Sequence, residues 1–213
     1  MKKKINSVDI LKKVGAVLTD DHFVYTSGKH GSVYINKDAL YPHTNETAQI
    51  GKMFAEKFKN KKIDTVVAPA LGGIILSQWT AYYLSKLKGR EIFGVYTEKT
   101  ADKNQIFTRG YDRFVKGKNV LVIEDLTTTG GSVRKVVDSV KKAGGKVVAV
   151  CVMVNRDPKK VTAEIVGGPF SSLGILAVDA VEEKDCDLCR QNKPINTTVG
   201  HGKKYLEAKK IKK

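Results

Sequence analysis

Short, almost continuously apolar segments alternate with longer amphipathic ones through the middle of the chain. The apolar segments predict strands at residues 64–68, 91–97, 119–123 and 146–154. The amphipathic segments predict helices at residues 45–59, 73–87 and 132–143, and the last of these places four valines on one face at helical spacing. Strands that are apolar throughout are typical of a parallel sheet covered on both faces. We therefore predict an α/β fold, a Rossmann-like parallel sheet flanked by helices.

The two ends of the chain follow this rhythm less closely. Ser7 is a candidate cap for a first helix, and residues 22–43 have no regular period. Residues 101–118 are predicted to be a polar loop, and further strands are expected at residues 161–166 and 173–181. The 213 residues suit a single α/β domain with modest additions.

Composition excludes several classes of protein. Hydrophobic residues make up 41% of the chain, which is enough for a core. No apolar run reaches the roughly 18–20 residues that a membrane span needs. The basic N-terminus is not followed by the apolar segment of a signal peptide, and three cysteines do not suit a disulfide framework. We expect a cytoplasmic protein.

The formal net charge of +16 favours an anionic ligand. Half of this charge lies in residues 1–4 and 203–213, where lysines are typically solvated. The remaining charge suits either nucleic acid or a phosphorylated small molecule, and charge alone does not distinguish them.

The most informative segment is residues 119–135, NVLVIEDLTTTGGSVRK. A predicted strand ends at Glu124 and Asp125, and small hydroxyl residues and glycines lead into a predicted helix. Such a turn directs backbone N–H groups and the helix N-terminus at one point, which suits a phosphate. Carboxylates accept hydrogen bonds from sugar hydroxyls. The segment therefore predicts a ribose 5-phosphate site, with the diol on the two acids and the phosphate on Thr127, Thr128, Thr129, Gly130, Gly131 and Ser132. An ordinary strand–turn–helix with solvated acids is the alternative.

Residues 120–132 resemble the phosphoribosyl pyrophosphate (PRPP) signature of type I phosphoribosyltransferases. The start of the chain, with SGK at residues 27–29 and YIN at 34–36, is similar to the orotate phosphoribosyltransferases. The resemblance covers about residues 6–155. It implies a hood segment at about residues 1–44, a core at about 60–155 and a C-terminal extension at 182–213 with a basic tail.

The resemblance also implies an activity and a set of site residues. The activity is Mg²⁺-dependent transfer of ribose 5-phosphate from PRPP to a nucleobase, by a homodimer. A loop after the strand at 64–68 would bind pyrophosphate, and a lid over residues 97–112 would cover it. Hood residues would contact the base. The implied residues are Ala70, Leu71, Gly72 and Gly73 in the loop, Lys99, Lys103 and Arg109 in the lid, and Ser27, Gly28, Lys29 and Tyr34 in the hood.

The sequence departs from the orotate pattern in ways that leave the base open. Thr26 stands where those enzymes usually have a lysine, and the lid lacks their histidine. A phosphoribosyltransferase for another base, such as a purine, is one alternative. A nucleic-acid-binding regulator that senses PRPP is another, although no recognition-helix or RNA motif is visible.

The cysteine pair CDLC allows two interpretations. Cys186 and Cys189, with His201, provide three ligands for zinc, and Cys151 or an aspartate is a candidate fourth. A second CxxC pair is absent, so reduced thiols in a C-terminal turn are the alternative. Cys151 lies in an apolar predicted strand, where a buried free thiol is expected.

Overall fold

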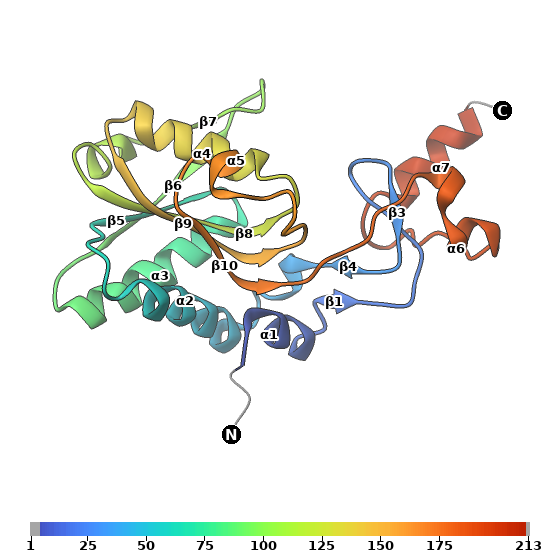
Figure 1. Cartoon of the computed structure of the whole chain (residues 1–213), viewed down its shortest axis with the longest axis horizontal. Helices are drawn as coiled ribbons and strands as arrows, with labels where there is room; N and C mark the ends of the chain where they lie inside the picture. The colour runs from blue at the N-terminus through green and yellow to red at the C-terminus, as the bar shows by residue number, and fades with distance from the viewer. Residues whose placement is uncertain (1–4, 212–213) are drawn as a thin grey trace.

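The computed structural model describes residues 5–211, and its centre is a six-stranded sheet (Figure 1). The strand order is β10-β9-β8-β5-β6-β7, and only β7 runs antiparallel to its neighbour. The strands are β5 (Thr65–Pro69), β6 (Phe93–Lys99), β7 (Gln105–Ile106), β8 (Asn119–Thr127), β9 (Lys146–Asn155) and β10 (Phe170–Ile175). The predicted α/β class and parallel sheet are confirmed.

Helices cover both faces of the sheet. One face carries α1 (Ser7–Lys13), α2 (Thr44–Phe58) and α3 (Gly72–Lys88), and the other carries α4 (Gly131–Lys142) and α5 (Ala163–Val166). Along β8, Leu121 and Ile123 join the core under α2 and α3, while Val120 and Val122 join the core under α4. Because successive side chains of a strand point to opposite faces, one apolar strand contributes to both cores.

Several predicted elements differ from the structure. The strand expected at 173–181 lies at Phe170–Ile175, and β8 continues past the predicted 119–123 to Thr127. Asn6, not Ser7, caps α1, because its side chain accepts hydrogen bonds from the N–H groups of Val8 and Asp9. Residues 161–166 were expected to form a strand, but Thr162 caps the short helix α5 there. The predicted polar loop at 101–118 contains β7 and a 3₁₀ turn, Tyr111–Phe114.

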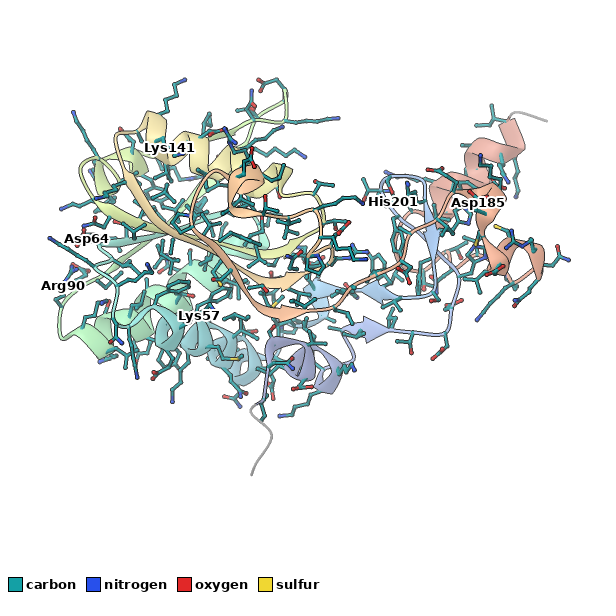
Figure 2. All side chains as sticks on the ribbon, in the orientation of Figure 1. Lys57, Asp64, Arg90, Lys141, Asp185 and His201 are labelled. Atoms are coloured by element: carbon teal, nitrogen blue, oxygen red, sulfur yellow. The ribbon has the colours of Figure 1, made fainter. Side chains whose placement is uncertain are left out.

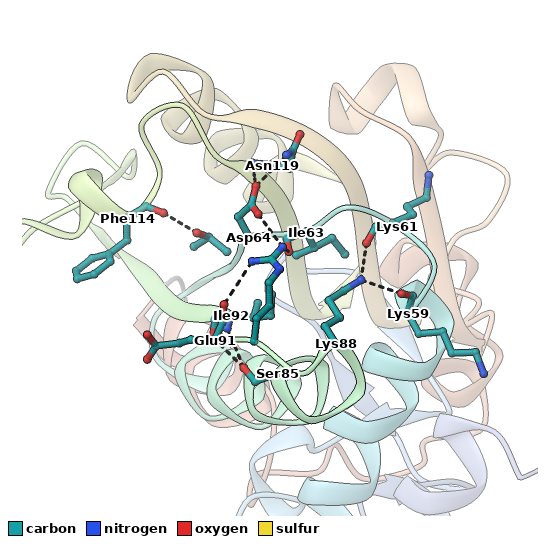
Figure 3. A network of polar contacts seen from close by, with 12 residues as sticks. Lys59, Lys61, Ile63, Asp64, Ser85, Lys88, Glu91, Ile92, Phe114 and Asn119 are labelled. Atoms are coloured by element: carbon teal, nitrogen blue, oxygen red, sulfur yellow. Dashed lines mark hydrogen bonds and ion pairs between the residues drawn. The ribbon is translucent and has the colours of Figure 1, made fainter.

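A polar network fixes the end of the sheet where β5 and β8 begin (Figure 3). The carboxylate of Asp64 accepts hydrogen bonds from the backbone N–H and side-chain amide of Asn119, at 2.9 and 2.8 Å, and from Arg90 at 2.8 Å. The Lys88 ammonium donates to the carbonyls of Lys59 and Lys61. Since these contacts join the starts of the strands, the opposite, carboxyl-terminal edge is left for a ligand site.

A second lobe lies beside the sheet and combines an N-terminal hairpin with a C-terminal segment of the chain (Figure 1). It contains β2 (Phe23–Val24), β3 (His30–Gly31), α6 (Asp187–Arg190) and α7 (Gly202–Ile211). The pair β1 (Val17–Leu18) and β4 (Tyr34–Ile35) connects it to the sheet, with short 3₁₀ turns at Lys37–Ala39 and Glu183–Asp185. Within residues 5–211 we find no helix with the length and hydropathy that crossing a bilayer requires.

Candidate active site

A cavity of about 430 Å³ opens at the carboxyl-terminal edge of the sheet. The ends of β5, β6 and β8 meet there because these strands are neighbours and run parallel. Its lining combines parts of both predicted anion-binding loops, both acids and four lysines: Lys37, Pro69, Ala70, Leu71, Gly72, Lys99, Lys103, Gln105, Glu124, Asp125, Leu126, Gly131, Ser132 and Lys135. Of the predicted loop residues, the lining does not include Gly73, Thr127, Thr128, Thr129 and Gly130.

The two acids lie at the base of this cavity and are almost buried, with 6% of Glu124 and 5% of Asp125 exposed. Both belong to β8, so their side chains leave the strand on opposite faces. Asp125 turns toward Tyr41, whereas Glu124 lies on the side of the α4 N-terminus. The two carboxylates are adjacent in sequence, but they lie on opposite faces of the strand.

Asp125 is held by two residues that follow the β2–β3 hairpin of the second lobe in sequence. Its Oδ2 lies 3.0 Å from the Lys37 ammonium and accepts a hydrogen bond from the Tyr41 hydroxyl at 3.0 Å. Burial opposes the charge on Lys37, but the nearby Asp125 carboxylate outweighs it and raises the pKa of Lys37. Burial and the same carboxylate raise the pKa of Tyr41, so its hydroxyl stays protonated. Asp125 is therefore a fixed acceptor whose position depends on Lys37 and Tyr41.

Glu124 has a different electrostatic environment. Burial, followed by the charge of Asp125, raises the pKa of the Glu124 carboxyl well above its usual value. A cation or a hydroxyl donor placed in the cavity would offset both effects. Glu124 is thus the acid of the pair that gains most from a bound ligand.

The loop from Thr127 to Ser132 has the form expected of an anion site. The Thr127 hydroxyl accepts the N–H of Gly130 at 3.0 Å, which closes the turn. Gly130 has φ of 78°, a backbone angle that favours glycine, and a Cβ there would lie 2.7 Å from Ile165. Both the backbone angle and the lack of space therefore require glycine. No side chain caps the start of α4. The Gly131 N–H makes a long contact with the Thr129 hydroxyl at 3.5 Å, so the N–H groups that follow it, beside the exposed residues Thr128 and Ser132, are the ones left to face a ligand.

The loop after β5 supplies fewer donors than the sequence implied. The peptide bond between Ala70 and Leu71 is cis. The Ala70 N–H already donates to the carbonyl of Thr97 at 2.8 Å, so only the following amides remain as candidates. A Cβ on Gly72 would lie 2.3 Å from the Tyr41 hydroxyl and 2.6 Å from Asp125 Oδ2. Gly72 therefore lets this loop approach the acid, while Gly73 packs closely on Ala68.

The segment predicted to form a lid contains a hairpin that contacts α4. Glu98 pairs with Ile106 and Lys99 with Gln105, and the Lys135 ammonium donates to the carbonyl of Lys103 at 2.6 Å. Lys99 and Lys103 line the cavity. Arg109 does not: it pairs with Glu98 at 2.9 Å and lines a neighbouring hollow with Leu71 and Tyr96.

The hood residues and His201 lie outside the cavity. Ser27 and Gly28 form an exposed turn, Lys29 pairs with Glu182 at 3.1 Å, and Tyr34 packs on Phe23. His201 belongs to the second lobe, far from Asp64 and Arg90 (Figure 2). Its Nε2 lies 2.9 Å from the Thr26 hydroxyl, so the structure does not support His201 as a partner of the two cysteines. Cys151 is fully buried in β9 and is not a partner either.

Comparison with known proteins agrees with this geometry. Residues 36–167 match the phosphoribosyl transferase domain family. The chain belongs to this family. Among similar phosphoribosyl transferases is the orotate phosphoribosyltransferase of Thermotoga maritima, 36% identical over 92% of this chain and 98% of that protein. The orotate phosphoribosyltransferase of Caldanaerobacter subterraneus subsp. tengcongensis is 34% identical over 91% and 95%.

Solved structures of phosphoribosyl transferases share the fold. An orotate phosphoribosyltransferase of Mycobacterium tuberculosis has a TM-score of 0.62 and 23% identity, over 80% of this chain and 95% of that one. The same enzyme in complex with PRPP gives a TM-score of 0.57 and 22% identity, over 82% and 92%. At 22–23% identity, these two structures show that the fold is shared and do not bear on the substrate.

Sequence reasoning missed two cavity residues of this phosphoribosyl transferase, Lys37 and Lys135, and also Tyr41, which contacts Asp125 but does not line the cavity. Lys37 and Tyr41 stand four residues apart near a 3₁₀ turn, within a segment that has no regular period. No local pattern marked them, because Tyr41 and Asp125 are 84 residues apart in sequence and meet only in the fold. Lys135 lies on the exposed side of α4, where a lysine is expected for solubility alone.

Proposed function

We propose that this chain transfers ribose 5-phosphate from PRPP to orotate, producing orotidine 5′-monophosphate and pyrophosphate. The observation that carries the proposal is that one cavity is lined by the acid pair, by parts of both predicted anion-binding loops and by four lysines. The orotate phosphoribosyltransferases that are similar over nine tenths of the chain support orotate as the base.

Each part of PRPP has a place in this cavity. The 5-phosphate would bind the turn of residues 127–132 and the start of α4, and the ribose diol would donate to Glu124 and Asp125. The pyrophosphate would lie between the amides that follow Ala70 and the ammonium groups of Lys99 and Lys103. Donors and cations are thereby placed where negative charge grows as the C1–O bond breaks.

The family implies Mg²⁺ with PRPP, and the acid pair fits such an ion. Carboxylate oxygens are the ligands that Mg²⁺ prefers, together with water and substrate phosphates. Because Lys37 and Tyr41 already occupy Oδ2 of Asp125, Glu124 is the carboxylate with more freedom to hold it. A bound Mg²⁺ would neutralise charge on the pyrophosphate.

The remaining groups position the reactants and exclude water. Lys37 and Tyr41 fix Asp125, so that the ribose is oriented for attack at C1 by a ring nitrogen of the base. The hairpin that carries Lys99 and Lys103 lies over the cavity, and its closure on PRPP would keep water from taking the sugar. No side-chain nucleophile is required by this route.

Release of pyrophosphate from PRPP and Mg²⁺ tests the proposal with orotate, uracil, adenine, hypoxanthine and guanine as acceptors. We expect turnover with orotate and a product with the mass of orotidine 5′-monophosphate. Turnover only with a purine would replace the base but keep the chemistry. Tight PRPP binding with no turnover on any base would contradict the proposal.

We further propose a homodimer, as the resemblance implies. Lys99 and Lys103 line the cavity of their own chain, so the single chain already brings these lysines to the acid pair. Sedimentation velocity with and without PRPP measures the assembly state. A monomer with full turnover would contradict the homodimer and leave the catalytic proposal intact.

A further inference from the structure

Four metal-ligating side chains converge in the second lobe, away from the cavity. They are His22, His30, Cys186 and Cys189, and their donor atoms all lie within 4.8 Å of one another. His22, His30 and Cys186 are buried, with 1%, 0% and 1% exposed, and Cys189 is partly exposed. We propose that these residues bind one Zn²⁺ ion that holds the second lobe together.

Three of the six distances between the donor atoms suit tetrahedral zinc. Ligand bonds of about 2.0–2.1 Å to nitrogen and about 2.3 Å to sulfur place the donors roughly 3.3–3.8 Å apart on the edges of a tetrahedron. Cys189 Sγ lies 3.3 Å from His30 Nδ1 and 3.7 Å from His22 Nε2, and Cys186 Sγ lies 3.7 Å from His22 Nε2. The two nitrogens are 2.8 Å apart, so they need to separate by a few tenths of an ångström.

The surroundings orient the ligands. The Nδ1 atom of His22 donates its hydrogen to the carbonyl of Lys193 at 2.8 Å, which leaves a lone pair on Nε2 directed at the cluster. A hydrogen bond of this kind on the outer nitrogen is typical of metal-bound histidine. Cys186 and Cys189 bracket the single turn of α6, so their i, i+3 spacing places both sulfurs on one side. Both cysteines are free, not joined in a disulfide.

A histidine pair without metal explains only half of this arrangement. His30 could donate to His22 Nε2, as a neutral pair in a protein interior does. That interpretation gives no reason for two thiols to converge on the same two nitrogens. Nε2 of the buried His30 ring has no partner among the described residues with or without the metal, so this atom does not distinguish the two interpretations.

The second lobe needs such a link because its apolar core is small. Phe23, Val24 and Tyr25 are buried, yet they belong to neither of the two hydrophobic clusters that cover the sheet. The ligands come from the β2–β3 hairpin and from α6, which are more than 150 residues apart in sequence. A zinc ion with four protein ligands leaves no open position for substrate, so its role here is structural.

Metal analysis of the full-length, untagged protein tests the site. After expression in zinc-supplemented medium and gel filtration, we expect about one Zn²⁺ per chain in the wild type. Cys186→Ser together with Cys189→Ser should lower the content at least tenfold. His201→Gln, in the same lobe, and Cys151→Ala, in the sheet, are the matched controls and should retain the metal. Equal zinc content in the wild type and the double variant would overturn the proposal.

Cobalt substitution keeps the test decisive if the double variant fails to fold. In the wild-type protein, Co²⁺ should give the visible bands of tetrahedral coordination and a near-ultraviolet thiolate-to-cobalt band. Neither band is expected from Co²⁺ bound to Glu124 and Asp125, which are oxygen ligands. A spectrum without the thiolate band, or displacement of Co²⁺ by excess Mg²⁺, would overturn the proposal.

Discussion

The Lys37–Asp125 contact gives a quantitative prediction because it joins the segment after the β2–β3 hairpin to the acid pair. Lys37→Met removes the ammonium that lies 3.0 Å from Asp125 Oδ2 and keeps most of the side-chain volume. The Tyr41 hydroxyl then remains as the other side-chain partner at that oxygen. The nearly buried Asp125 carboxylate would then have one side-chain partner fewer.

The expected cost lies between two measured limits. Exposed ion pairs contribute about 0–1 kcal/mol, whereas removing one partner of a buried pair costs about 3–5 kcal/mol. The side chain of Lys37 is 32% exposed and that of Asp125 is 8% exposed. We therefore expect the free energy of unfolding to fall by about 1–3 kcal/mol, a factor of about 5–150 in the folding equilibrium.

A double-mutant cycle with Asp125→Asn isolates this contact. Urea unfolding of the wild type, both single variants and the double variant should give a coupling free energy of about 1–3 kcal/mol. Lys135→Met is the matched control, because Lys135 lines the same cavity but contacts the carbonyl of Lys103 instead. Its coupling to Asp125 should stay within about 0.5 kcal/mol. If both lysines gave the same small coupling, Lys37 would be only a solvated neighbour.

Three further predictions concern the loop, the lid and the far end of the sheet. Gly72→Ala should weaken PRPP binding at least tenfold by calorimetry, because the added Cβ displaces the groups that hold Asp125. Gly131→Ala adds a Cβ that meets nothing closer than 3.6 Å, so its free energy of unfolding should stay within about 0.5 kcal/mol of the wild-type value. Lys99→Ala should lower kcat/KM for PRPP about 10–150-fold if it meets the pyrophosphate through a charge-assisted bond of about 1.5–3 kcal/mol, and an unchanged value would remove it from the site. Burial acts to raise the pKa of Asp64, but hydrogen bonds from Asn119 and Arg90 outweigh it and lower that pKa. Its contribution is therefore present above about pH 4 and is lost as pH falls through the lowered pKa, so the stability deficit of Asp64→Asn in urea unfolding should shrink in acid; a deficit independent of pH would contradict this.

The sequence predicted the sheet well because its strands are apolar on both faces. Buried parallel strands such as β8 and β9 carry their signal in every residue, so their position and type follow from a single window. Residues 161–166 show the opposite case. The apolar content suggested a strand there, but the Thr162 cap and the left-handed Gly167 determine a short helix.

The second lobe could not be derived from local patterns. Its strands are two residues long, and its structure depends on contacts between an N-terminal hairpin and a C-terminal segment of the chain. The CDLC motif identified two of the converging ligands, but His22 and His30 lie eight residues apart in an irregular segment and match no zinc spacing. His201 was the nearest histidine in sequence, which was a poor guide because α7 directs it to Thr26 instead.

The cavity itself shows which parts of a site a local pattern can specify. The acids and the two loops follow directly from strand ends, because a parallel sheet brings the ends of β5, β6 and β8 to one edge. The four lysines belong to different segments of the chain, and their positions in the cavity depend on tertiary contacts. The anion-binding backbone is therefore encoded locally, whereas the positive charge that balances a triply phosphorylated substrate is assembled by the fold. Single lysine variants should for this reason change binding strength and its salt dependence, while the loop glycines decide whether the site exists.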